Sequence, residues 1–177
     1  MVTDMQTSLP SVEEIWAWLD SVSDPEIPVL SVIDLGIVRN VRWSDDTEVP
    51  AVRDARELVP TLVVTVTPTY SGCPAATVIK NDIQRALQER GIGRVRIDTQ
   101  LSPAWTTDWL TERGRKRLLE YGIAPPKPQQ GSPSTLIPCP RCGSSDTRLV
   151  SRFGSTPCKA FYICNSCLEP FDYFKCH

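Results

Sequence analysis

The sequence predicts an α+β fold, in which a small three-stranded mixed sheet with helices is followed by a second, cysteine-rich β module. Strand-like alternation, helical spacing and alternation again occupy Leu62–Leu101, which is the order of a βαβ unit. A proline-rich stretch follows, and two closely spaced cysteine pairs lie beyond it. We therefore expect a first domain at 10–123, a linker at 124–137 and a second module at 138–177.

Composition and charge are those of an ordinary globular chain. The 177 residues are 41% apolar and carry a formal net charge of -2, so nucleic acid and membranes are not expected partners. No run approaches the roughly 20 apolar residues of a membrane-spanning helix, and the first residues lack the pattern of a secretory signal. We expect a cytoplasmic protein, whose seven cysteines favour metal binding over disulfides.

The first elements follow from capping and apolar spacing. Ser11 and Glu14 form a capping-box pattern at the start of a helix, which should end before Pro25. A strand is expected at 37–43, and the polar stretch 44–60 should be a long loop or an insertion.

The βαβ unit consists of two strands and the helix between them. Alternation predicts strands at 61–67 and 95–101, which should be parallel with a right-handed crossover. A last helix, capped by Thr106 or Thr107, completes the domain. The helix of the βαβ unit should span Ala75–Arg90, with an inward face made of Val78, Ile79, Ile83, Ala86 and Leu87.

Two cysteine pairs of the second module have the spacing of a metal site. Cys139 and Cys142 form one C-x2-C motif, and Cys164 and Cys167 form another after twenty-one intervening residues. Four such thiolates bind one tetrahedral Zn²⁺, with iron in the same four sulfurs as the alternative. A hairpin between the pairs would make this a zinc ribbon, in which the closed site is structural and supplies the folding energy.

Three further residues of this module have no assigned role. Cys158 lies in the expected hairpin, and Cys176 and His177 end the chain. Either cysteine could replace one of the four metal ligands, but isolated cysteines more often behave as small hydrophobic residues.

Cys73 is the single cysteine of the first domain, and it lies between a strand and a helix. Pro74 follows it at the expected first position of the helix. The helix dipole and free N–H groups there lower the pKa of a thiol, which suits a reactive thiolate or a metal ligand. A buried structural cysteine is the alternative. Asp24 and Glu26 could approach Cys73 from the end of the first helix, or could be ordinary loop carboxylates.

Several sequence blocks resemble known families. The first domain is similar to the SufT-like domain of metal–sulfur cluster assembly proteins, through Asp24–Glu26, Leu35–Val38 and Thr67–Pro74. The second module resembles the zinc ribbon of the PaaD family, through Cys139–Gly143, Phe153–Ala160 and Glu169–Cys176. PaaD proteins are accessory components of the bacterial phenylacetyl-CoA epoxidase system, also called phenylacetate-CoA oxygenase.

The resemblance implies a maturation role in phenylacetate degradation. A protein of this kind would help to assemble or insert iron or an iron–sulfur cluster, and its partner would be the reductase or the di-iron oxygenase component. Cys73 would handle the cargo in transit, with Asp24 and Glu26 as candidate neighbours. The resemblance implies no enzymatic role, and the sequence agrees, because it contains neither a Glu-x-x-His pair nor a dinucleotide fingerprint.

A non-catalytic docking component is the alternative function. Its ribbon would present an aromatic surface to the oxygenase, and the oligomeric state is left open, with a homodimer as one option. A nucleic-acid-binding ribbon is disfavoured by the balanced charge. The candidate aromatic residues are Phe161, Tyr162, Phe171, Tyr173 and Phe174.

Overall fold

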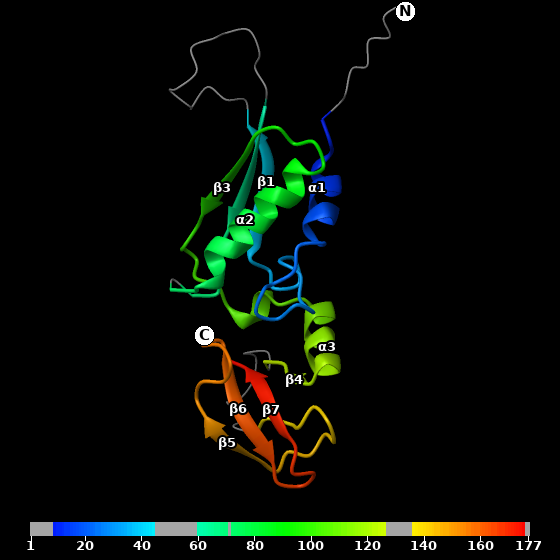
Figure 1. The fold of residues 1–177 in the computed structure, drawn as a ribbon, viewed down its shortest axis with the longest axis vertical. Coiled ribbons are helices and arrows are strands. Elements are labelled where there is room, and N and C mark those ends of the chain that lie inside the picture. The colour runs from blue at the N-terminus through cyan, green and yellow to red at the C-terminus, as the bar shows by residue number, and fades with distance from the viewer. Residues whose placement is uncertain (1–8, 45–59, 71, 127–135, 176–177) are drawn as a thin grey trace, which may run out of the picture.

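The computed structural model describes residues 9–44, 60–70, 72–126 and 136–175. Figure 1 shows the first sheet and its helices at one end of the molecule, the ribbon at the other, and α3 between them. The predicted loop at 44–60, most of the predicted linker, and Cys176 and His177 lie outside the described residues. The predicted α+β class, with a C-terminal β module, is confirmed.

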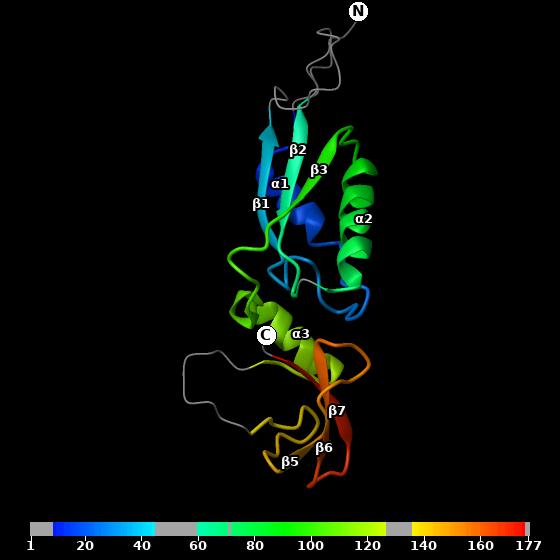
Figure 2. The same cartoon turned by 90° about the vertical axis from the view of Figure 1, so that its left-hand side faces the viewer.

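The first sheet has the order β1–β2–β3. β1 (Val38–Ser44) is antiparallel to β2 (Thr61–Val66), and β2 is parallel to β3 (Val95–Thr99), so the predicted three-stranded mixed sheet is confirmed. The central strand β2 is almost entirely buried. Figure 2 shows α1 (Val12–Leu19) and α2 (Ala75–Gln88) on one face of this sheet.

The helix α1 begins at the predicted capping box. The Ser11 hydroxyl accepts from the Glu14 N–H, and the Glu14 carboxylate accepts from the Ser11 N–H. The helix ends at Leu19, well before Pro25, because the chain turns to place Ile27 and other apolar residues in the core. The predicted helix end was therefore several residues too late.

The helices α2 and α3 differ from the prediction in detail. The buried face of α2 is narrower than expected, and Val78 is 45% exposed. The helix α3 (Glu112–Tyr121) is capped by Thr111, whose hydroxyl accepts from the Gly114 N–H. The predicted cap was wrong because Thr107 instead begins a separate 3-10 helix, Thr107–Trp109.

The second sheet contains four strands in the order β4–β7–β6–β5. The predicted hairpin is formed by β5 (Thr147–Ser151) and β6 (Lys159–Cys164). β7 (Pro170–Phe174) pairs antiparallel with β6, and β4 (Ile123–Ala124) pairs parallel with β7. The predicted boundary between residues 123 and 124 falls within β4, so the chain enters the second sheet directly after α3.

The two parts share a buried core. Phe174 of β7 is 1% exposed and packs edge to face on Trp105, with ring centroids 6.2 Å apart. Trp105 in turn donates its indole N–H to the Leu35 carbonyl at 2.8 Å. Ile123 and Cys158 belong to the same buried cluster as the core of the first domain. The ribbon is therefore packed on the first domain by aromatic and aliphatic contacts.

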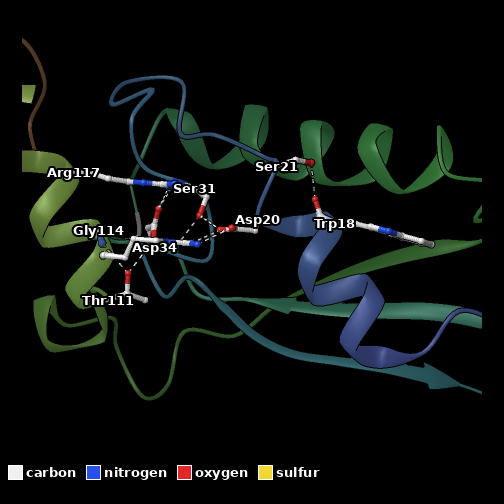
Figure 3. A network of polar contacts seen from close by, with 9 residues as sticks. Trp18, Asp20, Ser21, Ser31, Asp34, Thr111, Gly114 and Arg117 are labelled. Atoms are coloured by element: carbon white, nitrogen blue, oxygen red, sulfur yellow. Dashed lines mark hydrogen bonds and ion pairs between the residues drawn. The ribbon is translucent and has the colours of Figure 1, made fainter.

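A buried carboxylate connects α3 to the turn that follows α1. Figure 3 shows Asp34 among the side chains of this turn and of α3. Asp34 is fully buried and accepts from Arg113 Nε at 2.7 Å and Arg117 at 2.5 Å. Burial alone would raise the pKa of Asp34, but hydrogen bonds from Arg113, the Ser31 N–H and Thr111 outweigh it and lower the pKa. This network fixes the segment that leads to the candidate site.

Candidate functional site

The four cysteines of the two C-x2-C motifs converge in the ribbon. Their Sγ atoms all lie within 4.8 Å of one another. The Cys139 and Cys167 sulfurs are 3.7 Å apart, and the Cys142 and Cys164 sulfurs are 3.6 Å apart. A tetrahedral ion with bonds of about 2.3 Å would place its sulfurs about 3.8 Å apart. The arrangement therefore fits a four-thiolate metal site of the zinc type.

Backbone hydrogen bonds shape both motifs, and in the second motif they also reach a sulfur. The Gly143 N–H donates to the Cys139 carbonyl at 2.9 Å, in a turn where Gly143 has φ of 74°. In the second motif, the Cys167 N–H approaches the Cys164 sulfur at 3.5 Å. Backbone N–H groups of Cys167 and Ser166 lower the pKa of Cys164 to about 6. A metal ligand must be deprotonated, so these donors favour the bound form.

Cys158 does not take part in this site. The four-thiolate cluster is complete without it, so the suggestion that Cys158 replaces one of the four ligands was wrong. Its side chain is 6% exposed and packs into the core shared with the first domain. Burial raises the pKa of Cys158 to about 11, and the Glu26 and Asp24 carboxylates add to the rise.

Cys73 lies between β2 and α2, as predicted, and opens onto a cavity. Its N–H donates to the Tyr70 carbonyl at 3.2 Å, and the residue is partly buried. The cavity has a volume of about 250 Å³, and besides Cys73 it is lined by the charged residues Asp24 and Lys80, by threonines that include Thr67, and by several apolar side chains. The Thr67 hydroxyl is buried and has no hydrogen-bond partner within the described ranges.

The start of α2 lies next to the thiol, and the Ala76 N–H donates to the Cys73 carbonyl at 3.2 Å. Pro74 occupies the N-cap position of α2, whereas the sequence predicted it at the first helical position. Its side chain makes no capping hydrogen bond. The first turn of α2 carries no acidic side chain. The positive end of the helix dipole therefore lies in the region of Cys73, and no acidic side chain of the first turn neutralises it.

Asp24 and Glu26 have different positions in the site. Asp24 lines the cavity together with Cys73, and its carboxylate also accepts from the Glu26 and Ile27 N–H groups at 2.7 Å each. Burial raises the pKa of Asp24 despite these hydrogen bonds. Glu26 is turned towards the ribbon, where its Oε2 lies 3.7 Å from the Cys158 sulfur.

Sequence reasoning missed two members of this neighbourhood, Tyr70 and Cys158. Burial raises the pKa of Tyr70, and negative charge on Cys73, Glu26 and Cys158 raises it further. Cys73 is thus a neighbour of Tyr70 that acts on the pKa of the phenol. Tyr70 lies within the sequence block Thr67–Pro74, which was the only available signal for it.

Comparisons with known proteins agree with both halves of this description. A family model for the PaaD zinc beta ribbon domain matches residues 123–175, and one for an iron-sulfur cluster assembly protein matches residues 12–98. The chain is 49% identical over 170 residues to a putative 1,2-phenylacetyl-CoA epoxidase subunit of Escherichia coli (strain K12). That alignment covers 94% of each protein.

Other similar proteins match only part of this chain, a part about as long as the first domain. An Fe-S protein maturation auxiliary factor of Porphyromonas gingivalis is 35% identical, over 65% of this chain and 94% of its own. A solved domain of unknown function from Bacillus anthracis has a TM-score of 0.49 at 22% identity, and covers 60% of this chain and 89% of its own.

The described helices offer no membrane-spanning segment, because none combines sufficient length with sufficient apolar character. The ribbon holds a four-cysteine metal-binding site. The first domain matches the iron-sulfur cluster assembly model, and the identity to the E. coli protein extends over nearly the whole chain. The chain therefore belongs to the PaaD family.

Proposed function

We propose that this chain is a cytoplasmic, non-enzymatic accessory factor that helps to assemble or insert iron or an iron–sulfur cluster into a phenylacetyl-CoA epoxidase complex during phenylacetate degradation. The observation that carries the proposal is Cys73, a partly buried thiol that opens onto a cavity at the start of α2. The similarity to a putative epoxidase subunit and to a maturation factor supports this role. The recipient would be the reductase or the di-iron oxygenase component.

The chemistry of the cavity suits a soft metal held by a thiolate. Cys73 supplies a sulfur ligand, which iron and iron–sulfur clusters prefer. A volume of about 250 Å³ could hold several water-sized groups, at about 30 Å³ each. An ion with its remaining ligands would therefore fit.

The number of thiols indicates transit more than residence. A permanently bound cluster is normally held by four cysteines, and the first domain has only Cys73. The four cysteines of the ribbon already form a separate metal-binding cluster with one another. Cargo bound through so few sulfurs can be passed to a partner that offers a complete ligand set.

The docking alternative needs a different surface from the one expected. Phe171 and Phe174 are buried, and Tyr162 packs against Phe171 within the ribbon. The described ribbon instead exposes apolar side chains along β5 and beyond it, with Phe153 67% exposed and Leu149 46% exposed. If the chain acts only as a docking component, we propose that this edge of the ribbon makes the contact.

Replacing Cys73 with serine should abolish cargo delivery while leaving the fold intact. Serine keeps the size of the side chain but is a poor ligand for iron. The epoxidase subunits should be coexpressed with each variant in cells that lack the native copy, purified anaerobically, and analysed for iron, acid-labile sulfide and epoxidation. We expect subunits produced with Cys73→Ser to resemble those produced with no copy at all.

Val78→Ser is a matched control, because Val78 is an exposed residue of the adjoining helix. Subunits made with this variant should carry normal metal. Normal metal in both partners made with Cys73→Ser would contradict the assembly role. Together with a stable stoichiometric complex, that result would favour docking.

A further inference from the structure

Cys73 lines a cavity whose other walls are mostly aliphatic. Leu35 and Ile37 precede β1, Val66 ends β2, and Ile79 lies on α2. Such walls favour a polarisable, weakly hydrated group, because burying a strongly hydrated one is costly. A second sulfur atom attached to the Cys73 thiol is a group of this kind.

The number of ligand side chains distinguishes a covalently held atom from a bound ion. Within the described ranges, only the four ribbon cysteines bring three or more Cys, His, Asp or Glu ligand atoms within 4.8 Å of one another. In this arrangement, an ion at Cys73 would therefore draw fewer than three such ligands from the described residues. A sulfur atom held by an S–S bond needs Cys73 alone.

The Thr67 hydroxyl offers this cavity a hydrogen-bond donor. Thr67 lines the cavity and is 1% exposed, and its Oγ1 has no partner among the described residues. Its backbone is held in place, because its N–H donates to the Ile37 carbonyl at 2.8 Å. A buried hydroxyl without a partner is unfavourable, so an acceptor bound at Cys73 would stabilise this arrangement.

Lys80 gives the cavity a positive charge. It lines the cavity, is partly buried, and forms no ion pair with another described residue. A persulfide loses its proton more readily than a thiol does, and a nearby cation favours the resulting anion. Asp24 is the acidic residue among the described lining residues. Its Oδ1 accepts from the Glu26 and Ile27 N–H groups, and burial raises the pKa of Asp24, so it opposes an anion less than an ordinary carboxylate would.

We propose that Cys73 carries sulfane sulfur as a persulfide, whose outer sulfur accepts a hydrogen bond from the Thr67 hydroxyl and is balanced in charge by the Lys80 ammonium. The inference rests on the proposed function, because it names sulfur as the component that Cys73 holds during cluster assembly. The cavity volume of about 250 Å³ has room for the outer sulfur, since a water-sized group takes about 30 Å³.

The sulfur atom is exchanged between thiols without net oxidation or reduction. The Cys73 thiol loses its proton, and the thiolate attacks the outer sulfur of a donor persulfide, R–S–SH. A new S–S bond forms on Cys73 while the S–S bond of the donor breaks, and the leaving thiolate RS⁻ takes up the proton. An acceptor thiolate then attacks the same outer sulfur, and Cys73 returns to the thiol.

Glutathione persulfide is the sulfur donor for the test. Full-length protein with Zn²⁺ in the ribbon should be equilibrated anaerobically with mixtures of glutathione persulfide and glutathione of known ratio. Rapid alkylation followed by peptide mass spectrometry locates and quantifies the added sulfur at each cysteine. We expect the equilibrium constant for sulfur transfer to Cys73 to exceed that for free cysteine at least about fivefold, the value of one net hydrogen bond.

Variants test the role of each lining residue. Thr67→Val keeps the shape of the side chain without its hydroxyl, and it should lower the equilibrium constant at Cys73 about fivefold. Thr77→Val is the matched control, because Thr77 is exposed on α2 and does not line the cavity. Lys80→Gln should also lower the constant, and added salt should reduce its difference from the wild type.

Two results would overturn the inference. One is a constant for Cys73 no higher than that for free cysteine, and the other is equal constants for folded Thr67→Val and Thr77→Val. If Thr67→Val does not fold, the comparisons of the wild type with free cysteine and with Lys80→Gln decide. Metal-poor epoxidase subunits made with Cys73→Ser would then leave the proposed function standing, with a metal as the cargo. Normal subunits would contradict the proposed function whether or not the persulfide forms.

Discussion

Removal of the ribbon metal should unfold residues 136–175 and weaken the first domain. The ribbon's own buried cluster is small, and Cys139 and Cys164 are two of its five buried members. Metal binding to such a module contributes about 10 kcal/mol or more at neutral pH. Loss of β7 would also uncover Trp105, since Phe174 packs on it, and deletion of a buried aromatic contact costs about 3 kcal/mol.

The measurement combines chelation with spectroscopy. Metal content should be followed by mass spectrometry while two-dimensional NMR monitors ribbon and first-domain amides separately. Cys139→Ser should reproduce the effect of the chelator, whereas Cys158→Ala should retain one tightly bound metal per chain. A ribbon that keeps its dispersed amide signals after the metal is gone would refute a folding role for the site.

Asp34→Ala should lower the free energy of unfolding by about 3 kcal/mol, because it removes the buried partner of two guanidinium groups. Asp34 is fully buried, while the Arg113 and Arg117 side chains are 46% and 40% exposed. The arginines can therefore regain water, so the cost falls at the lower end of the range for a broken buried ion pair. Urea unfolding followed by circular dichroism measures the change.

Asp82→Ala is the comparison for this substitution. Asp82 pairs with Arg85 on the surface of α2, with the arginine side chain 65% exposed. Such a pair contributes little, so the change should be within about 0.5 kcal/mol. Equal effects of the two substitutions would show that the Asp34 network does not stabilise the fold.

The dependence of stability on pH should also report the contribution of the Asp34 network. The pKa of Asp34 is lowered in the folded state, so the unfolded chain takes up its proton first, at an ordinary pKa of about 3.9. The contribution of Asp34 is therefore fully present above that pH and is lost as the pH falls through the folded pKa. The wild type should lose stability below about pH 4 more steeply than Asp34→Ala does.

Local patterns were sufficient to predict much of the fold. The strand Thr61–Val66 and the Ser11–Glu14 capping box could be predicted from neighbours in the sequence, and both occur as expected. Thr111 was missed as the cap of α3 because its hydroxyl also donates to the buried Asp34 carboxylate, a tertiary contact. β4 has only two residues, which is too short for any period to be visible.

The residues of the candidate site likewise fall into those that local patterns predict and those that depend on tertiary packing. The four ribbon cysteines could be predicted because a C-x2-C turn determines the positions of its own sulfurs, and Cys73 because it lies directly between a strand and a helix. Cys158 could not be assigned from spacing, since its approach to Glu26 depends on how the ribbon packs on the first domain. That packing is carried by Trp105 and Phe174, whose pairing no local pattern encodes.

The edge-to-face contact of Trp105 and Phe174 also has an evolutionary consequence. The first domain and the ribbon can each be recognised separately in sequence. A ribbon transferred to another first domain by recombination would nevertheless pack correctly only if its residue at position 174 fitted the side chain at position 105. A change in volume at either position should be accompanied by an opposite change at the other. Positions 105 and 174 are thus expected to change together among related sequences, as a coevolving pair, because the ribbon packs on the first domain through these two residues.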